Sequence, residues 1–525
     1  MQMKSTSGGI SDPRSEGGWL RRDWLLLVLP LVAFALYLGC SNGYGYFRDE
    51  LYYLACSRHM AWGYVDQPPL SIAILYLVRV TLGVSRLAIH VVPALAGATT
   101  LLLTGLIVRY LNGGRYAQSL AMASVLVAPL FLAINTFYSM NSLDIVWWTL
   151  AAYLLVRILE GQEARWWPLL GVVLGLGLMN KISVLWLGLG LAVGLLATRQ
   201  RRWLATKGPW IAACTAMVIF LPYVLWQVRW DWPTLEFMHN ATTYKMASIS
   251  PFAFLSEQVL DLQPLTLPIW LTGLVWSLVS RRGRRLRPLG IAWLTVLAIL
   301  LLNGKSRASY LGPAYPMLLA MGAVAIAHWC RRRGWRWVPA AALTIVVVGG
   351  AVTAPAALPV LPVKEHIEYT EMLGLTPHSA EQTKVAALPQ IFADRFGWPS
   401  LVRKVAAVYE SLSASERKST AIFAENYGEA GAIDLCGQAR GLPAAISGHN
   451  NYWLWGPPKK PISTLIVVSD ASDLPKLRKL FDQVVVEGSR SCKYCMPYEA
   501  ASVIYLCRGP RRSLTELWPQ VKHFI

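Results

Sequence analysis

The chain has 525 residues, of which 55% are hydrophobic and 15% are charged. A soluble domain ordinarily carries about 25% charged residues, so lipid is a simpler partner than water for this much apolar surface. The formal net charge is +20, but most arginines form short clusters between apolar runs and no nucleic-acid recognition motif accompanies them. This placement argues against nucleic-acid binding.

Eleven apolar stretches are predicted to be membrane-spanning helices, since a span needs about 20 mostly apolar residues. In chain order they are residues 24–42, 86–108, 117–135, 144–160, 168–180, 183–198, 209–228, 259–280, 288–303, 309–329 and 336–355. The fifth and sixth are short, and one broken hairpin is the alternative for them. Arg21 and Arg22 precede the first stretch and no convincing cleavage site follows it, so we expect a retained helix with a cytoplasmic N-terminus.

Clusters of arginine set the expected orientation of these helices. Three clusters, at residues 199–202, 281–285 and 331–333, fall in loops that are cytoplasmic when the N-terminus is inside. This alternation agrees with the rule that cytoplasmic loops carry the excess of Lys and Arg. We therefore expect a multi-pass protein of a bacterial inner (plasma) membrane, with its C-terminal region outside the cytoplasm, in the periplasm.

Two segments between or after the apolar stretches are predicted not to span. Residues 43–85 form a long external loop, in which 51–62 and 70–80 have the pattern of short amphipathic helices on a membrane surface. The proline-rich residues 355–363 are typical of a linker. The predicted division is a transmembrane domain over residues 1–355 and an external domain over residues 356–525.

The C-terminal region has the pattern of a small α/β domain. Short strand-like runs at 421–424, 464–468, 484–486 and 503–506 are separated by helical stretches and glycine turns. The sequence Asn426-Tyr-Gly-Glu429 is predicted at a strand-to-helix turn. Four cysteines lie here, Cys436, Cys492, Cys495 and Cys507. A disulfide among them is expected rather than zinc, because the single CxxC motif lacks a second ligand pair.

Acidic residues at the outer membrane boundary are candidates for catalysis, because ionisable groups at membrane depth are costly. Asp49 and Glu50 follow the first helix, and a carboxylate there has the chemistry of a general base that takes a proton from an acceptor hydroxyl or amine. Asp144, at the start of the fourth helix, is a candidate second acid that orients the acceptor or holds a divalent cation. Helix capping is the alternative for both positions.

Cations lie on the same predicted side. Lys181 interrupts an apolar hairpin, and a lysine that snorkels to the interface is the alternative. Lys305, Arg307 and Tyr310 stand at a helix entrance, where external cations oppose the positive-inside rule. A lipid-linked phosphate is the natural anion to compensate them, with ordinary lipid headgroup contact as the alternative. Acids that activate a nucleophile and cations that hold a leaving phosphate predict glycosyl transfer from a lipid-linked donor.

Two motifs in the external loop strengthen this hypothesis. The first external loop of the protein mannosyltransferase-like superfamily resembles Tyr46-Phe-Arg-Asp-Glu-Leu-Tyr-Tyr-Leu-Ala-Cys56 and Gly63-Tyr-Val-Asp-Gln-Pro-Pro-Leu70. That superfamily includes the lipid A aminoarabinose transferases and has the C-type glycosyltransferase membrane fold. Ala94-Leu-Ala-Gly97, Asn180-Lys181 and Lys305 through Pro316 follow in the same order, and the similarity covers about residues 1–330.

The resemblance implies a fold, a donor and a set of site residues. The implied donor is undecaprenyl-phosphate-linked or similar, and the implied transfer inverts the anomeric carbon. By resemblance, Asp49 is the catalytic base with Glu50 beside it, Asp144 is the second acid, and Lys181, Lys305, Arg307 and Tyr310 lie near the lipid phosphate. Asp66, Arg86 and His90 are further candidates.

The sequence departs from the superfamily pattern in two places. Aminoarabinose transferases carry a Lys where Gln67 stands, and many relatives have an Arg where His90 stands, with Arg86 one turn away. Both departures argue against an aminoarabinose transferase specifically. No metal ligand is assigned, and a divalent cation stays an open alternative because metal dependence varies among the relatives.

The function predicted from these residues is a membrane glycosyltransferase, hexosyl or pentosyl, with a polyprenyl-phosphate sugar donor. Its acceptor is an external lipid, glycan or protein that the sequence does not identify, and membrane lipid surrounds it. The main alternative is a polytopic transporter or lipid flippase, which inverted repeats would favour. A non-catalytic membrane scaffold is a third class, and it predicts that Asp49→Asn has no effect.

Overall fold

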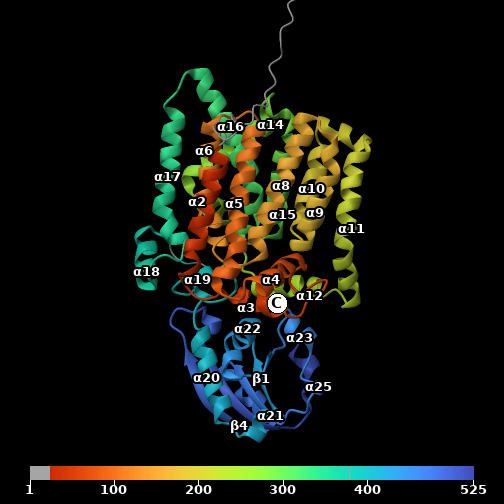
Figure 1. The fold of residues 1–525 in the computed structure, drawn as a ribbon, viewed down its shortest axis with the longest axis vertical. Helices are drawn as coiled ribbons and strands as arrows, with labels where there is room; N and C mark the ends of the chain where they lie inside the picture. The colour runs from red at the N-terminus through yellow and green to blue at the C-terminus, as the bar shows by residue number, and fades with distance from the viewer. Residues whose placement is uncertain (1–23, 376, 378) are drawn as a thin grey trace, which may run out of the picture.

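The computed structural model describes residues 24–375, 377 and 379–525. Arg21 and Arg22, on which the predicted cytoplasmic N-terminus partly rests, lie outside the described residues. Figure 1 shows a bundle of long helices joined at one end to a smaller α/β region, with the short helices α3, α4 and α12 at the boundary. We call these parts the helical region (residues 24–357) and the α/β region (residues 398–525).

The helical region alternates long helices with short ones at the boundary. In chain order it contains α2 (Leu25–Gly39), α3 (Arg48–Cys56), α4 (Leu70–Thr81), α5 (Arg86–Tyr110), α6 (Arg115–Leu126), α7 (Pro129–Ile134), α8 (Met140–Gly161), α9 (Trp167–Asn180), α10 (Val184–Leu196), α11 (Lys207–Arg229), α12 (Pro233–Asn240), α13 (Pro251–Asp261), α14 (Leu267–Val279), α15 (Arg287–Asn303), α16 (Tyr315–Arg333) and α17 (Val338–Ala357). After it come α18 (Val363–Met372) and α19 (Gln390–Ala393).

Six helices in the described part of the chain are long and apolar enough to cross a membrane, or seven if one bent pair counts as a span. The six are Leu25–Asn42, Arg86–Tyr110, Met140–Gly161, Lys207–Arg229, Ala308–Arg333 and Val338–Ala357. All eleven predicted stretches are at least partly helical, but several are too short or too bent to pass this test. The count of eleven spans therefore stays a prediction.

Proline explains two of the breaks. Ala128 has extended backbone (ψ 122°) before Pro129, which ends the helix predicted over 117–135 at Leu126. Gln263 has a positive φ before Pro264, and the helices on either side of it meet at 92°. The proline-rich linker is shorter than predicted, because α17 continues through Pro355 to Ala357.

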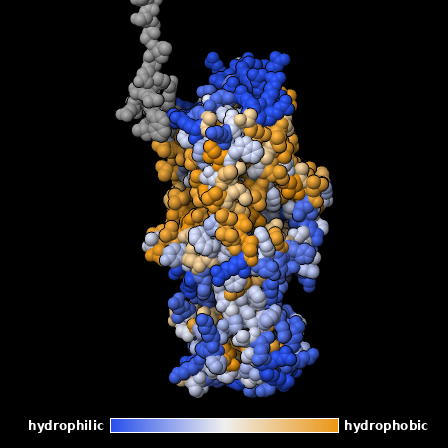
Figure 2. All heavy atoms as spheres, turned by 90° about the vertical axis from the view of Figure 1, so that its right-hand side faces the viewer, coloured by the Kyte–Doolittle hydropathy of each residue, from blue (hydrophilic) through white to orange (hydrophobic). Residues whose placement is uncertain are grey.

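The outer surface of the helical region is apolar. Figure 2 shows a broad hydrophobic band around the bundle, with hydrophilic surface above it and over the α/β region below it. Leu302, Phe252 and Val279 are among its most exposed side chains, at 88%, 83% and 72%. Such a continuous apolar surface is unfavourable in water and matches a lipid environment.

Glycines allow the long helices to approach one another closely. A Cβ on Gly322 of α16 would lie 1.8 Å from the carbonyl oxygen of Ile269 in α14, and one on Gly273 would lie 2.0 Å from that of Leu318. Gly171 of α9 faces the backbone of Ala212 in α11 in the same way. In lipid the hydrophobic effect does not drive helices together. Small residues at these contacts let the helices approach closely, so that van der Waals packing holds them together.

The α/β region is built on a five-stranded sheet with the order β2-β1-β3-β5-β4. Its strands are β1 (Thr420–Ala424), β2 (Ala445–Ile446), β3 (Thr464–Ser469), β4 (Phe481–Ser491) and β5 (Ala501–Pro510). Its helices are α20 (Trp398–Ser411), α21 (Ala414–Lys418), α22 (Tyr427–Cys436), α23 (Asn451–Trp455), α24 (Leu474–Leu480) and α25 (Leu514–Leu517). Strands β2, β1 and β3 are parallel, and β5 pairs antiparallel with both β3 and β4. Register is direct, with Ile422 opposite Ile466.

These elements confirm the predicted α/β pattern, with one strand missed. The four predicted strand-like runs lie in β1, β3, β4 and β5, whereas the two-residue β2 is too short for a periodic signal. Asn426 is the N-cap of α22 and accepts hydrogen bonds from the backbone N–H groups of Gly428 and Glu429, as expected at a strand-to-helix turn. The disulfide joins Cys492 and Cys495, while Cys436 and Cys507 are free thiols.

The two regions share a buried interface at the predicted external loop. Helix α3 was expected on a membrane surface, but its residues from Leu51 to Cys56 are all buried, because α22 packs against them. A Cβ on Gly431 of α22 would lie 2.7 Å from the backbone of Leu51. Asn451 accepts a hydrogen bond from the backbone N–H of Val65 at 2.7 Å. The loop is thus fixed from both sides, which positions the acidic residues that it carries.

Candidate active site

A cavity of about 480 Å³ lies where the helical region meets the α/β region. It brings together seven of the predicted residues, Asp49, Asp66, Asp144, Lys181, Lys305, Arg307 and Tyr310. These come from six different segments between α3 and the 3-10 helix Ala308–Ala314. Glu50, Arg86 and His90 are not among the residues that line it.

Asp49 faces the cavity from the first turn of α3, and the α/β region holds it there. The hydroxyl of Tyr427, in the first turn of α22, donates a hydrogen bond to Asp49 Oδ1 at 2.9 Å. Asp49 does not cap its helix. The N-cap residue is Phe47, and the backbone N–H of Phe47 donates to the carboxylate of Glu50. The carboxylate of Asp49 is therefore available to a ligand in the cavity.

Glu50 has a structural environment instead. Its Oε1 lies 2.7 Å from His90 Nε2 and accepts the backbone N–H of Tyr138 at 2.6 Å, while its Oε2 accepts the N–H of Phe47 at 2.8 Å. The side chain is fully buried. Burial opposes its charge, but His90, Arg395 and these hydrogen bonds outweigh that effect and lower the pKa of Glu50. Glu50 is next to the proposed base in sequence, but its side chain does not line the cavity, because neighbouring residues of a helix point about 100° apart.

Asp66 is a second carboxylate in the cavity. The hydroxyl of Tyr52 lies 3.0 Å from Asp66 Oδ1 and 3.1 Å from Asn451 Oδ1, so this tyrosine connects the acid to the α/β region. Burial, with the nearby charge of Asp49, raises the pKa of Asp66 to about 7. Asp66 therefore takes up or releases a proton near neutral pH, next to a carboxylate that faces the same space.

Asp144 and Lys181 meet at the helical wall of the cavity. Ser183 Oγ donates to Asp144 Oδ2 at 2.8 Å, and Lys181 Nζ lies 3.7 Å from the same oxygen. Asp144 is not a helix cap, because Ser139 is the N-cap of α8. Lys181 stands at the break between α9 and α10, where its backbone is extended. It also donates to Asn141 Oδ1 at 2.7 Å, so it is held in the wall rather than extended toward an interface.

The remaining cations gather on the loop before α16. Lys305 Nζ donates to the carbonyl oxygen of Thr242 at 2.9 Å, and Arg307 is paired with Glu381. Tyr310 carries the ammonium of Lys181 over its ring, 5.0 Å from the centroid. These contacts hold the cations around one side of the cavity while leaving donors directed to a ligand.

Lys245 is a cavity residue that the sequence analysis did not select. It ends the π-helical turn Ala241–Lys245, and its Nζ lies 4.0 Å from Glu381 Oε1. Burial lowers its pKa, and the charge of Glu381 opposes this. The available signal was its position in a loop predicted to be external, against the positive-inside rule, but no motif marked it.

The departures from the superfamily pattern also have positions. Gln67 is buried beneath the cavity loop and accepts the Ser71 hydroxyl at 3.3 Å, and it is not a lining residue. Arg86 begins α5, one turn before His90. Within the described residues, no three His, Cys, Asp or Glu side chains are grouped so that they could hold a metal ion.

Comparison with known proteins agrees with the predicted resemblance. A family model described as dolichyl-phosphate-mannose-protein mannosyltransferase matches residues 66–226, less than half of the chain. No curated protein sequence matches the chain. The resemblance to the C-type glycosyltransferase superfamily that the loop motifs predict is thereby confirmed, over the part of the chain that the model covers.

Solved structures extend the likeness to nearly the whole chain. The crystal structure of ArnT from Cupriavidus metallidurans bound to undecaprenyl phosphate matches with a TM-score of 0.62 and 15% identity, over 94% of this chain and 98% of that chain. Its apo state matches with 0.61 and 15%, over 93% and 98%. An apo oligosaccharyltransferase from Archaeoglobus fulgidus has a TM-score of 0.49 and 12% identity, over 87% and 70%, and no argument rests on it. At these identities the likeness to ArnT establishes the fold.

Proposed function

We propose that this chain is a membrane glycosyltransferase that moves a sugar from a polyprenyl-phosphate donor to an acceptor outside the cytoplasm. One observation carries the proposal: three acids and four cations line a single cavity at the end of the helical region that meets the α/β region. The acids are Asp49, Asp66 and Asp144, and the cations are Lys181, Lys245, Lys305 and Arg307. The fold likeness to ArnT, whose structure contains undecaprenyl phosphate, supports the same class of donor.

Asp49 is the proposed base. It accepts the proton of the acceptor hydroxyl or amine as the acceptor atom forms its bond to the anomeric carbon. The bond between that carbon and the phosphate oxygen breaks on the opposite face, and its electron pair stays on the phosphate. A single displacement of this kind inverts the anomeric configuration. Tyr427 holds the carboxylate in one orientation throughout.

The leaving phosphate is proposed to bind at the cations. Lys305, Arg307 and Lys245 approach the cavity from two external loops, and Tyr310 adds a hydroxyl donor. Fixed positive groups stabilise the negative charge that develops on the phosphate, and they do so most effectively where bulk water is excluded. Asp144 and Lys181 neutralise each other at 3.7 Å, so we assign them to orientation of the sugar or acceptor.

The proposed topology follows the same order. The N-terminus is cytoplasmic, residues 1–355 form the transmembrane domain with the external loop 43–85, and residues 356–525 form a periplasmic or extracytoplasmic domain. The arginine-rich loops at 281–285 and 331–333 lie at the end of the bundle opposite the cavity, which supports a cavity on the outer side. A transporter or flippase has less support, because it does not require an acid fixed by Tyr427.

The test is transfer of radiolabelled sugar from a panel of polyprenyl-phosphate sugars, hexosyl and pentosyl, in membranes of a host that lacks related transferases. The host membranes are supplemented with an envelope extract of the source cell to provide the acceptor. We expect transfer by the wild type and a loss of at least about 100-fold in Asp49→Asn. The matched control is Asp482→Asn, an exposed carboxylate of β4 far from the cavity, which keeps wild-type activity.

Release of label from the donor to water gives a second readout that needs no acceptor. Equal transfer by wild type and Asp49→Asn would remove Asp49 as the base. Movement of intact donor across vesicle membranes, with neither transfer nor hydrolysis, would favour the flippase.

A further inference from the structure

A second and larger cavity, of about 890 Å³, lies in the α/β region and adjoins the candidate active site. Lys245 lines both cavities. Tyr427 stands between them, with its hydroxyl on Asp49 in the first cavity and the guanidinium of Arg48 over its ring, 4.5 Å from the centroid, in the second. Arg48, which lines the second cavity, therefore packs against Tyr427, which lines the first.

The cavity opens at a topological switch point of the sheet. Strands β1 and β3 are parallel neighbours, but the helices that follow them cover opposite faces. Ile422 and Ile466 pack with α20 and α22 on one face, while Leu465 and Val467 pack with α24 and Trp518 on the other. In open α/β sheets, ligands bind in the crevice at the carboxyl ends of strands where the connections diverge in this way.

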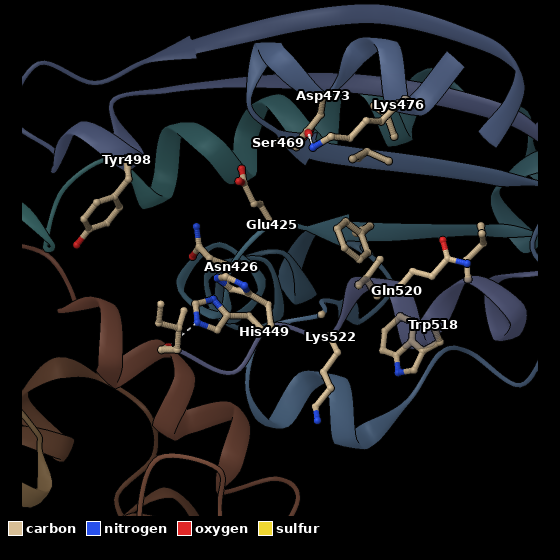
Figure 3. A pocket seen from close by; sticks show the side chains of 18 of the residues that line it. Glu425, Asn426, His449, Ser469, Asp473, Lys476, Tyr498, Trp518, Gln520 and Lys522 are labelled. Atoms are coloured by element: carbon tan, nitrogen blue, oxygen red, sulfur yellow. Dashed lines mark hydrogen bonds and ion pairs between the residues drawn. The ribbon is translucent and has the colours of Figure 1, made fainter. Parts of the chain in front are cut away.

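Polar residues at these strand ends line the cavity. They are Glu425 and Asn426 after β1, Gly448 and His449 after β2, and Ser469 and Asp473 at and after β3. Figure 3 shows Glu425, Asn426 and His449 on one side, with Ser469, Asp473 and Lys476 across from them and Trp518 and Gln520 on a further wall. The carboxyl ends of all three parallel strands thus contribute to one site.

Two of these side chains carry polar atoms that no described residue satisfies. Ser469 is 3% exposed and His449 is 4% exposed, and neither Ser469 Oγ nor His449 Nδ1 has a hydrogen-bond partner in the described part of the chain. A buried hydroxyl or ring nitrogen without a partner costs about 1–3 kcal/mol. Both residues line the cavity, but the two unpartnered atoms are enclosed beneath its surface.

Four of the five Lys and Arg side chains that line the cavity face a carboxylate, and the two lining charges without an ion pair among the described residues, Glu425 and Lys479, are opposite in sign, so the lining favours a neutral ligand. Lys476 lies 2.8 Å from Asp473 and Lys522 lies 2.6 Å from Glu236. Lys245 faces Glu381, and Arg48 faces Glu499 at 3.7 Å. The N-terminus of α22 is also closed to an anion, because Asn426 already accepts the N–H groups of Gly428 and Glu429.

The walls between the polar groups are apolar. They comprise Phe423, Leu465, Val467, Leu477, Leu480, Phe481 and Trp518. Most of the lining residues belong to the α/β region, which Figure 1 shows on the far side of α3 from the helix bundle, so a lipid chain is a poor occupant. Sugar rings suit this lining, since their C–H faces contact apolar and aromatic side chains while their hydroxyls bond to carboxylates, amides and hydroxyls.

We propose that this cavity is the acceptor subsite and that it binds a neutral oligosaccharide. The proposal rests on the proposed function and narrows its acceptor to a glycan. The saccharide lies along the carboxyl ends of β1 and β3, and its end residue extends past Lys245, which lines both cavities, toward Asp49. Carboxylates such as Glu425 accept hydrogen bonds from its hydroxyl groups, and Phe481 and Trp518 contact the C–H faces of its rings.

Binding can be measured apart from transfer, by titrating the purified full-length protein in detergent and following tryptophan fluorescence. The probes are neutral di- to tetrasaccharides released from the surface glycans of the source cell. We expect saturable binding by wild type and by Asp49→Asn. Glu425→Gln and Asp473→Asn should each weaken it about tenfold, as expected when a hydrogen bond to a charged group is lost. The control Asp482→Asn, exposed on β4, should bind as wild type does.

Transfer assays then separate this inference from the proposed function. Glu425→Gln should raise the KM for the saccharide about tenfold and leave donor hydrolysis to water unchanged. Saccharide binding without any transfer would keep the subsite and reject the glycosyltransferase. The subsite would be overturned if the protein transferred sugar but bound no saccharide in the titration. It would also be overturned if Glu425→Gln and Asp473→Asn left saccharide binding unchanged. Preferential binding of hydrophobic peptides or of phosphorylated sugars, used as comparison probes, would also overturn it.

Discussion

The helical region and the α/β region contribute to the candidate active site in different ways. The helical region carries the side chains assigned to chemistry, including Asp49, Asp144 and Arg307. The residues after α17 supply the partners that orient them: Tyr427 donates to Asp49, and Glu381 pairs with Arg307. The comparison teaches that the site is complete only when both parts are in place, although the family model matches residues of the helical region alone.

After Asp49→Asn, replacement of Arg307 is expected to lower the transfer rate more than any other substitution proposed for the two regions. Arg307→Gln removes a cation proposed to stabilise the departing phosphate, so we expect kcat to fall about 100- to 1,000-fold. Radiolabel transfer at saturating donor measures this. Glu381→Gln should cost far less, because it removes the partner and keeps the cation. An equal loss in both variants would assign Arg307 to the structure and not to the phosphate.

The adjacent acids Asp49 and Glu50 offer a sharper comparison. Glu50→Gln leaves His90 and a backbone N–H with a weaker acceptor in a fully buried place, so we expect a loss of about 2–3 kcal/mol in stability. Asp49→Asn should change stability by well under 1 kcal/mol while abolishing transfer. Thermal unfolding in detergent measures both, with the exposed Glu487→Gln as a control. A stable Glu50→Gln protein without transfer would instead give Glu50 a direct role.

Tyr427→Phe tests whether the α/β region positions the base. Loss of its hydrogen bond to a carboxylate should lower kcat about tenfold, with little change in the KM of the donor. The matched control is Tyr505→Phe in β5, which removes another buried hydroxyl that donates to the carbonyl oxygen of Asp470. If the two variants behave alike, Tyr427 only packs.

A further expected effect, on stability and not on transfer, is a dependence on pH. The pKa of Asp66 is raised to about 7, chiefly by burial, above about 3.9 in an unfolded chain. Between these values the native state holds a proton that the unfolded state has lost, so stability falls as pH rises. The loss is at most about 1.4 kcal/mol per pH unit for this group. Asp66→Asn should flatten the dependence of melting temperature on pH between 4 and 7; an unchanged slope would contradict the assignment.

The sequence by itself predicted a multi-helix membrane protein and most residues of the candidate site. Apolar length, arginine-rich loops and the loop motifs are local patterns, because each depends on residues that are close in sequence. Local patterns predicted long helices, a C-terminal α/β sheet and seven residues that line one cavity. The interruption predicted at Lys181 is where α9 ends, whereas the break at Pro264 lies inside a stretch predicted as one helix. Local patterns also predicted the turn at Asn426.

Only the tertiary structure decided which acid of the pair faces the cavity and which is buried. Asp49 and Glu50 are adjacent in sequence, but α22 brings Tyr427 to Asp49, whereas α5 brings His90 to Glu50. Lys245 lies near the other cations because its turn and the segment that contains Glu381, which are distant in sequence, meet in the fold. The cavity at the ends of β1 and β3 exists because α22 and α24 cover opposite faces of the sheet. These outcomes depend on contacts between residues distant in sequence, which no local pattern encodes.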